Sequence, residues 1–277
     1  MSYHFHSIKT FMHVPMARFF CLILAGLCLS GCAGGPGASV APQKDMVTDS
    51  DESEPRRRNR IRLELALGYF DQGKTHIALD EVKQALVQDP GFVDAYNLRG
   101  LIYMRLNDLR LAEESFRRGI ELDPRNGGVL HNLGWLQCQT RRYAEADALF
   151  GRALTAPGYP DTAKTLLTQG ICQIRAGQTA EAEVTLGRAY ALDPGNPVTG
   201  YNLAQLLLTR GDLNRAQFYI RRVNNSDFAN AETLWLGIKV ERRLGNQDAM
   251  RQLADTLNRR FASSREIQLY EKGAFNE

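Results

Sequence analysis

The chain has 277 residues, of which 44% are hydrophobic and 23% are charged, and its formal net charge is +3. This length and composition suit one or two globular domains with an ample core. Removing residues 1–31 takes away Lys9 and Arg18 and no acid, so the remaining chain carries a net charge of +1. A nearly neutral chain gives no electrostatic reason to expect a nucleic-acid partner.

An apolar run at 19–29 is the first element along the chain, and Arg18 precedes it as a positive flank. The run is shorter than the roughly 20 residues of a membrane-spanning helix, so it is typical of a secretory signal peptide. It ends in LSGC, which resembles the lipobox of bacterial lipoproteins. The resemblance implies cleavage after residues 1–31, the lipoprotein signal peptide, and acylation of Cys32. A free cysteine behind an ordinary signal peptide is the alternative. Ala33 follows instead of Asp, which by the same resemblance favours the outer membrane.

Residues 32–55 are predicted to be the lipidated cysteine and a flexible tether. The stretch after Cys32 is rich in Gly, Ala, Ser, Pro and acid, so it has no apolar face to bury. A flexible chain of this length has an end-to-end distance of roughly 25 Å. The sequence RRRNR at 56–60 then predicts a solvated first helical turn, with contact to lipid headgroups as the alternative.

Residues 56–277 repeat with a period of 34, which is the period of the tetratricopeptide repeat. Each repeat of this kind is a pair of antiparallel helices, here called the A helix and the B helix. Three sets of residues recur in register: small residues in A at Ala66, Gly100, Gly134, Gly170 and Ala204; small residues in B at Ala78, Ala112, Ala146, Ala182 and Ala216; and large apolar residues in B at Val82, Phe116, Phe150, Leu186 and Ile220.

This pattern has a physical reason. A bulky side chain would overpack the point where the A and B backbones cross, and the large residue of B fills the space beside it. Gly73, Gly177 and Gly211 fall at the turn between A and B, where a left-handed residue can end a helix. We therefore predict an all-α tetratricopeptide-repeat superhelix with five clear repeats, a degenerate sixth at about 230–261, and a C-terminal capping helix.

No catalytic or metal-binding constellation is apparent in the sequence. His76 and His131 have no Cys, Asp or Glu at a defensible metal-ligand spacing. No nucleophile-elbow, phosphate-loop or zinc-protease motif occurs. We therefore expect a protein that is not an enzyme and that has no cofactor.

Cys138 and Cys172 lie in the A helices of repeats three and four, which should stack side by side. A secreted compartment favours a disulfide, and the chain-entropy model assigns this one roughly 4 kcal/mol. Two buried free thiols fit the sequence equally well, because cysteine is also a good small core residue.

A groove lined by the A helices is the predicted binding surface. Its lining positions carry an apolar set: Leu63, Leu67, Phe70, Leu101, Met104, Trp135, Leu167, Ile171 and Ile174. An exposed apolar stripe of this kind indicates a protein partner, although coverage by the terminal helix would also explain it. Leu63 and Leu67 stand where carboxylate-clamp repeats have Lys and Asn, so a C-terminal chaperone tail is not expected.

Lipobox, short tether and repeat stack together resemble the PilF/PilW family of type IV pilus biogenesis lipoproteins, the secretin pilotins. The more specific stretches are LALGYFDQGKTHIALDEVKQAL, VLHNLGWLQCQTRRYAEADALFGRAL and YPDTAKTLLTQGICQIRAGQTAEAE. The last two carry Cys138 and Cys172 where members of the family often place a disulfide, so the resemblance implies that bridge.

The resemblance implies a lipid-anchored, periplasm-facing outer-membrane protein without catalysis. It would bind the outer-membrane secretin subunit and promote its localisation and multimerisation for pilus biogenesis and twitching motility. One alternative is an envelope adaptor that recruits cell-wall enzymes, and another is a Tad-type pilus assembly lipoprotein.

Overall fold

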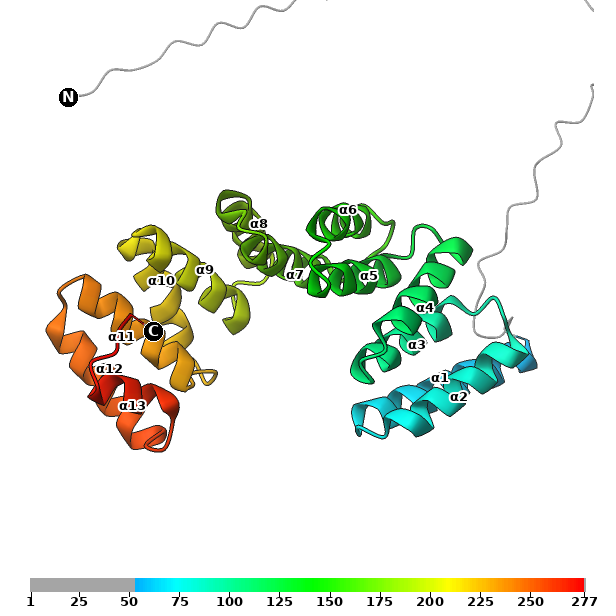
Figure 1. The fold of residues 1–277 in the computed structure, drawn as a ribbon, viewed down its shortest axis with the longest axis horizontal. Coiled ribbons are helices and arrows are strands. Elements are labelled where there is room, and N and C mark those ends of the chain that lie inside the picture. The colour runs from blue at the N-terminus through cyan, green and yellow to red at the C-terminus, as the bar shows by residue number, and fades with distance from the viewer. Residues whose placement is uncertain (1–52, 277) are drawn as a thin grey trace, which may run out of the picture. The chain divides into compact units, whose positions relative to one another are not determined.

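Helices make up the ordered architecture of the computed structural model, which describes residues 53–276 (Figure 1). No strand occurs within this range. The helices are α1 (Glu54–Asp71), α2 (Thr75–Gln88), α3 (Val93–Arg105), α4 (Leu109–Leu122), α5 (Gly127–Gln139), α6 (Tyr143–Leu154), α7 (Thr162–Arg175), α8 (Thr179–Leu192), α9 (Pro197–Arg210), α10 (Leu213–Asn224), α11 (Ala231–Arg243), α12 (Gln247–Arg260) and α13 (Arg265–Glu271). The predicted signal peptide, Cys32 and nearly all of the predicted tether lie outside the described residues.

The first helix begins two residues earlier than the predicted domain boundary. Glu54 and Pro55, assigned to the tether from the sequence, form the first turn of α1. Proline is tolerated there because the first helical amides have no partner within the helix, and an acid is favourable at that end. The arginines of residues 56–60 are exposed, as predicted for a solvated first turn.

Each odd-numbered helix from α1 to α11 is an A helix, and the following even-numbered helix is its B helix. The members of each pair pack together, and each B helix up to α10 also packs on the next A helix. Successive A helices contact one another along the whole series, whereas within residues 53–276 no two B helices come close. The A helices therefore form a continuous layer, and the B helices are splayed apart.

The crossing of A on B is as tight as the repeat pattern predicts. A Cβ atom added at Gly100 would lie 2.3 Å from the ring of Phe116, which is fully buried. The equivalent atom at Gly134 would lie 2.9 Å from Phe150, and at Gly170 it would lie 2.6 Å from Leu186. The large residue of B thus occupies the volume that a side chain on A would need.

The turns between A and B use left-handed residues. Gly73, Gly177 and Gly211 have φ values of +74°, +78° and +84°, which confirms their predicted role. Asn107 and Arg141 take the same conformation in the second and third pairs, with φ values of +61° and +62°. Asparagine visits this region readily, whereas Arg141 shows that packing of the flanking helices can impose it.

The degenerate sixth repeat is a complete helix pair, α11 and α12, and α13 packs on both of its helices. Ile267 of α13 is buried, and the ring of Phe275 stacks on Trp235 with centroids 5.4 Å apart. These contacts cover the apolar end that the last pair would otherwise expose. The predicted fold of five clear repeats, a sixth and a capping helix is confirmed.

We predict that Gly100→Ala destabilises the protein by about 1–3 kcal/mol, because the added methyl group must displace the buried Phe116 ring. Gly151→Ala in α6 is the matched control, since a Cβ there would have nothing within 4 Å. It should stabilise the helix by about 0.5–1 kcal/mol. Denaturant unfolding of both variants measures the difference, and equal effects would contradict the crossing argument.

Candidate protein-binding surfaces

The predicted groove residues all lie on A helices that contact one another in sequence. Three of them are on α1, at Leu63, Leu67 and Phe70, and the others are on α3, α5 and α7, at Leu101, Met104, Trp135, Leu167, Ile171 and Ile174. Because α1, α3, α5 and α7 touch successively, these side chains belong to one layer of the fold. We call this set of nine residues in the A-helix layer the A-face stripe.

The A-face stripe is less exposed than its sequence positions imply. Leu67 is 47% exposed, whereas the other residues of the stripe are half-buried. Leu63 and Phe70 pack against the core of the first two pairs, and Leu101 and Met104 pack against the next core cluster. Each A helix partly covers its neighbour, so these side chains serve both core and surface.

Two aromatic residues of the stripe are covered by arginines of later repeats. The guanidinium carbon of Arg105 lies 3.4 Å from the ring centroid of Phe70, and Arg105 also donates to the Phe70 carbonyl oxygen. Arg175 lies 4.8 Å from the ring of Trp135 in the same manner. The stripe therefore carries guanidinium groups beside two of its apolar side chains, which the sequence reasoning did not anticipate.

The first helix pair exposes additional apolar side chains that the sequence reasoning missed. Ile61, Leu65 and Ile77 are each about half exposed, and together with Leu67 they form a set here called the N-terminal apolar surface. Leu65 and Leu67 lie two residues apart on α1, so they point to different sides of that helix. No helix of residues 53–276 precedes α1 to cover this face. The sequence signal that could have indicated this exposure is that α1 and α2 form the first repeat, because the first unit of a stack lacks one neighbour.

A small cavity of about 210 Å³ adjoins Leu63 at the start of α1. Asn59 lines it and is only 2% exposed, and its side-chain oxygen has no hydrogen-bond partner. Asp94 also lines the cavity, and burial together with the charge of Asp123 raises the pKa of its carboxyl group. Polar and apolar groups therefore meet at this end of the A-face stripe.

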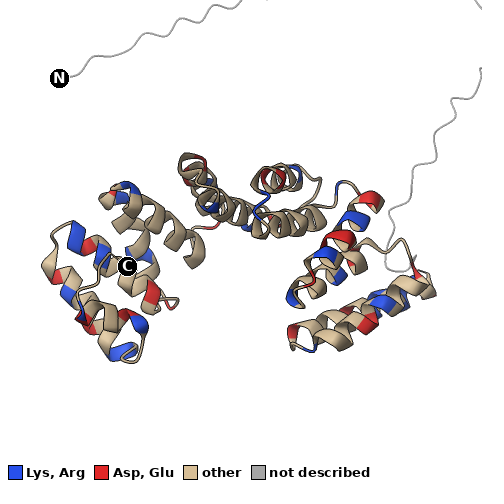
Figure 2. Ribbon diagram, viewed as in Figure 1, with Lys and Arg blue, Asp and Glu red and all other residues tan. Residues whose placement is uncertain are grey.

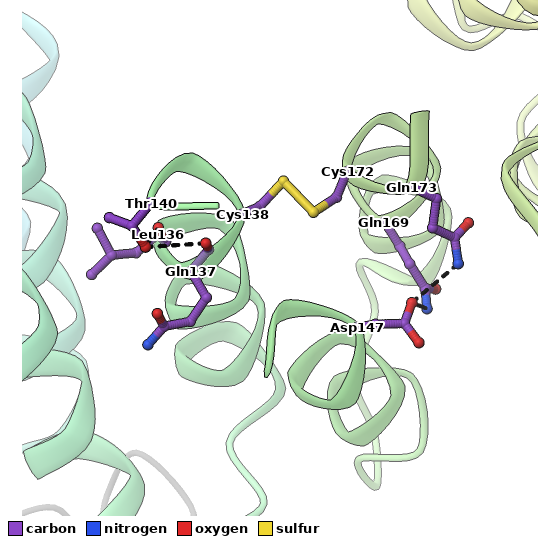
Figure 3. Close-up of a disulfide and its surroundings, with 8 residues drawn as sticks. All are labelled: Leu136, Gln137, Cys138, Thr140, Asp147, Gln169, Cys172 and Gln173. Atoms are coloured by element: carbon purple, nitrogen blue, oxygen red, sulfur yellow. Dashed lines mark hydrogen bonds between the residues drawn. A yellow bond between two sulfur atoms is a disulfide. The ribbon is translucent and has the colours of Figure 1, made fainter. Parts of the chain in front are cut away.

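Cys138 of α5 and Cys172 of α7 form a disulfide, with Cα atoms 5.8 Å apart and both residues buried (Figure 3). The bridge spans the irregular connection at 155–161, which is longer than the four-residue links after α2, α4 and α8. Asp147 of α6 accepts hydrogen bonds from Gln169 and Gln173 of α7 at 2.8 and 3.1 Å. The third and fourth pairs are thus joined covalently and by hydrogen bonds from two buried glutamines to one carboxylate.

The histidines in the described range have structural rather than ligand-binding surroundings. His131 is 6% exposed, its Nδ1 lies 2.8 Å from the Thr165 hydroxyl, and burial lowers its pKa to about 4. The Tyr159 hydroxyl contacts the same threonine oxygen at 2.8 Å. His76 is exposed on α2. Within residues 53–276, no group of His, Cys, Asp and Glu is arranged to hold a metal ion.

The helices of residues 53–276 include none with the length and apolar character needed to cross a bilayer. Figure 2 shows charges of both signs interspersed along most of these helices, whereas α5 has no Lys, Arg, Asp or Glu. This surface offers no extended field of one sign.

Models of the tetratricopeptide repeat match residues 63–127, 131–197 and 173–234. Proteins built on this repeat generally act as binding scaffolds, and no catalytic family is indicated.

Two pilus proteins are similar to most of the chain. Type IV pilus assembly protein PilF of Pseudomonas aeruginosa is 25% identical over 260 residues, which cover 94% of this chain and 99% of PilF. The crystal structure of PilW, described as a widely conserved type IV pilus biogenesis factor, matches with a TM-score of 0.71 and 31% identity. That match covers 77% of this chain and 98% of PilW. A solved structure of P. aeruginosa PilF has the same fold, with a TM-score of 0.72, 24% identity and coverage of 80% and 100%.

We predict that replacing both bridged cysteines, as Cys138→Ala with Cys172→Ala, lowers the free energy of unfolding by roughly 4 kcal/mol in the chain-entropy model. Alkylation of the unreduced, denatured wild-type chain followed by mass spectrometry checks the bridge directly. Neither cysteine should react until a reductant is added, and labelling of both without a reductant would show that no bridge exists.

Proposed function

Because this chain belongs to the tetratricopeptide-repeat family of type IV pilus biogenesis factors that includes PilF and PilW, we propose that it is a secretin pilotin. It binds the outer-membrane secretin subunit and promotes the localisation and multimerisation of that subunit. The repeat domain acts as a scaffold and catalyses no reaction. Lipid attached to Cys32 holds the scaffold at the outer membrane, facing the periplasm.

The observation that carries this proposal is the N-terminal apolar surface. Ile61, Leu65, Leu67 and Ile77 are all about half exposed on one helix pair. Exposed apolar side chains gathered on one helix pair indicate surface that a partner covers. Leu67 also belongs to the A-face stripe, so the apolar surface leads into the layer of A helices.

The stripe limits the kind of segment that this surface accepts. Phe70 is half-buried beneath Arg105, so a bound segment meets a guanidinium group immediately beside the apolar side chains. An amphipathic or extended secretin segment with apolar residues next to an acid would match both features. Leu63 and Phe70 then shape the floor of the site, and Leu67 makes the exposed contact.

Membrane attachment through Cys32 rests on the sequence, since that residue lies outside the described range. Mature lipoproteins carry several acyl chains, and stable anchoring needs more than one. The disulfide between Cys138 and Cys172 supports an exported location, because such bridges persist in oxidising compartments. The tether lets the scaffold reach a secretin subunit while the lipid stays in the membrane.

Similarity along nearly the whole of PilF favours this function over the two alternatives, an envelope adaptor for cell-wall enzymes and a Tad-type assembly lipoprotein. Intact secretin multimers and normal twitching in a deletion strain would contradict the proposal and favour one of them.

We predict that Leu65→Glu with Leu67→Glu abolishes secretin capture, because the two substitutions place charge on both exposed apolar sides of α1. The measurements are co-purification of the secretin from membranes and the yield of its multimers. Val87→Glu on α2 is the matched control, since Val87 is 81% exposed and lies outside this surface. Wild-type helical circular dichroism in the double variant, together with unchanged secretin multimers, would overturn the assigned surface.

We also predict that Cys32→Ser removes the protein from the outer-membrane fraction, because the acylated thiol is lost. Fractionation followed by immunoblotting should detect a soluble chain or an uncleaved precursor. Unchanged outer-membrane recovery would contradict the lipid anchor and would leave the secretin-binding surface untouched.

A further inference from the structure

A hollow of about 360 Å³ lies between the B helices α4 and α6, above the A helix α5. It exists because successive B helices stand apart while the A helices touch. Its apolar walls are formed by Ile120, Leu133, Ala148 and Leu149. The hollow is formed around B helices, whereas the A-face stripe and most of the N-terminal apolar surface lie on A helices.

The floor of the hollow holds a buried amide with an unused acceptor. Gln137 of α5 is fully buried, and its Nε2 donates to the Glu113 carboxylate at 3.3 Å. Its Oε1 has no partner. A carboxylate can only accept, so this contact fixes which end of the amide faces Glu113. A buried acceptor without a donor costs free energy, so a ligand that supplies one N–H group is favoured.

Neighbouring groups hold this amide in place. Glu113 also accepts from Arg142 and Arg117, and these contacts lower its pKa to about 2. Gln137 precedes Cys138, and Figure 3 shows its side chain pointing away from the disulfide that binds α5 to α7. The floor is therefore anchored from both sides, and the amide is set in advance of binding.

The rim of the hollow selects against an ionised ligand. The rim carries two arginines, Arg117 and Arg152, and two glutamates, Glu121 and Glu145, so its formal charges cancel. The two guanidinium groups are themselves held, Arg117 by Glu113 and Arg152 by the Pro124 carbonyl oxygen at 3.0 Å. Anchored guanidinium groups can lie against an aromatic face, as Arg105 and Arg175 do elsewhere in this fold.

A second hollow shows what the repeat geometry alone produces. It measures about 440 Å³ and lies among α10, α11 and α12, at the same positions of the repeat. Glu241 stands there in place of Gln137, and its carboxylate accepts from Gln217, Arg221 and Asn246. The opening is thus a product of stacking, and this second hollow also has apolar walls and an unpartnered amide oxygen, that of Asn224. The charged Glu241 in its floor, where the hollow above α5 has the neutral Gln137, distinguishes the two.

We propose that the hollow between α4 and α6 binds a tryptophan side chain of a partner protein. Indole is large and apolar, carries one N–H donor and no acceptor, and has no charge. Each property matches an observed feature: the apolar walls, the single unused Gln137 oxygen and the neutral rim. The two tryptophans of this chain lie in α5 and α11 and do not line the hollow, so the occupant comes from another molecule.

The test uses the chain from residue 32 onward with Cys32→Ser, which retains the whole compact helical unit. N-acetyl-tryptophanamide is titrated into the isotope-labelled protein and followed by amide NMR. Shifts should cluster on α4, α5 and α6 around the hollow. The 1-methyl analogue, which lacks the N–H donor, should bind about fivefold more weakly, as expected for the loss of one hydrogen bond.

Matched variants separate the amide from the shape of the hollow. Gln137→Met should weaken binding about fivefold, whereas Gln173→Met should not, although Gln173 also has a buried unpartnered Oε1. Ala148→Leu should abolish binding by filling the space, with Ala144→Leu on the same exposed side of α6 as its control. Absence of clustered shifts up to the solubility limit of the probe would overturn the proposal. Equal affinity for the methylated probe and for Gln137→Met would overturn it as well.

Discussion

The contact on which the rest of this structure depends is the crossing of a small residue in each A helix against a large residue in its B helix. Gly100 against Phe116 shows it most sharply, because even one added carbon atom would collide with a buried ring. Close approach at this point sets the angle and spacing of a helix pair. The contact recurs in the third and fourth pairs, at Gly134 and Gly170, so successive pairs present nearly the same face to the next one and stacking can propagate along the chain.

The stacking has opposite consequences on its two sides. The A helices touch in series, so their outward side chains are partly covered and become half core and half surface. The B helices stand apart, so hollows open between α4 and α6 and between α10 and α12. The A side is consequently a continuous stripe suited to an elongated segment, whereas the B side offers separate hollows suited to single side chains.

Polar contacts join successive pairs at matching places. Each of these contacts links a B helix to the following A helix: Glu113 with Gln137, Asp147 with Gln173, and Gln217 with Glu241. An apolar interface alone tolerates sliding, whereas a carboxylate that accepts hydrogen bonds across the interface must stay beside its donors. These contacts therefore hold the register of the stack, and the disulfide adds a covalent link at the irregular connection between α6 and α7.

The sequence by itself determined the repeat, the helix pairs, the left-handed glycines of the turns and the capped C-terminal end. These features follow from residues at a fixed spacing, because the period, the small residue and the glycine act within one pair. Only the tertiary structure decided how exposed each binding residue is. Three features depend on contacts between different pairs or on the absence of such contacts. They are the coverage of Phe70 by Arg105, the exposure of Ile61 and Leu65, and the unpartnered oxygen of Gln137. A repeat pattern describes each unit in the same terms, whereas exposure depends on which neighbour stands beside that unit.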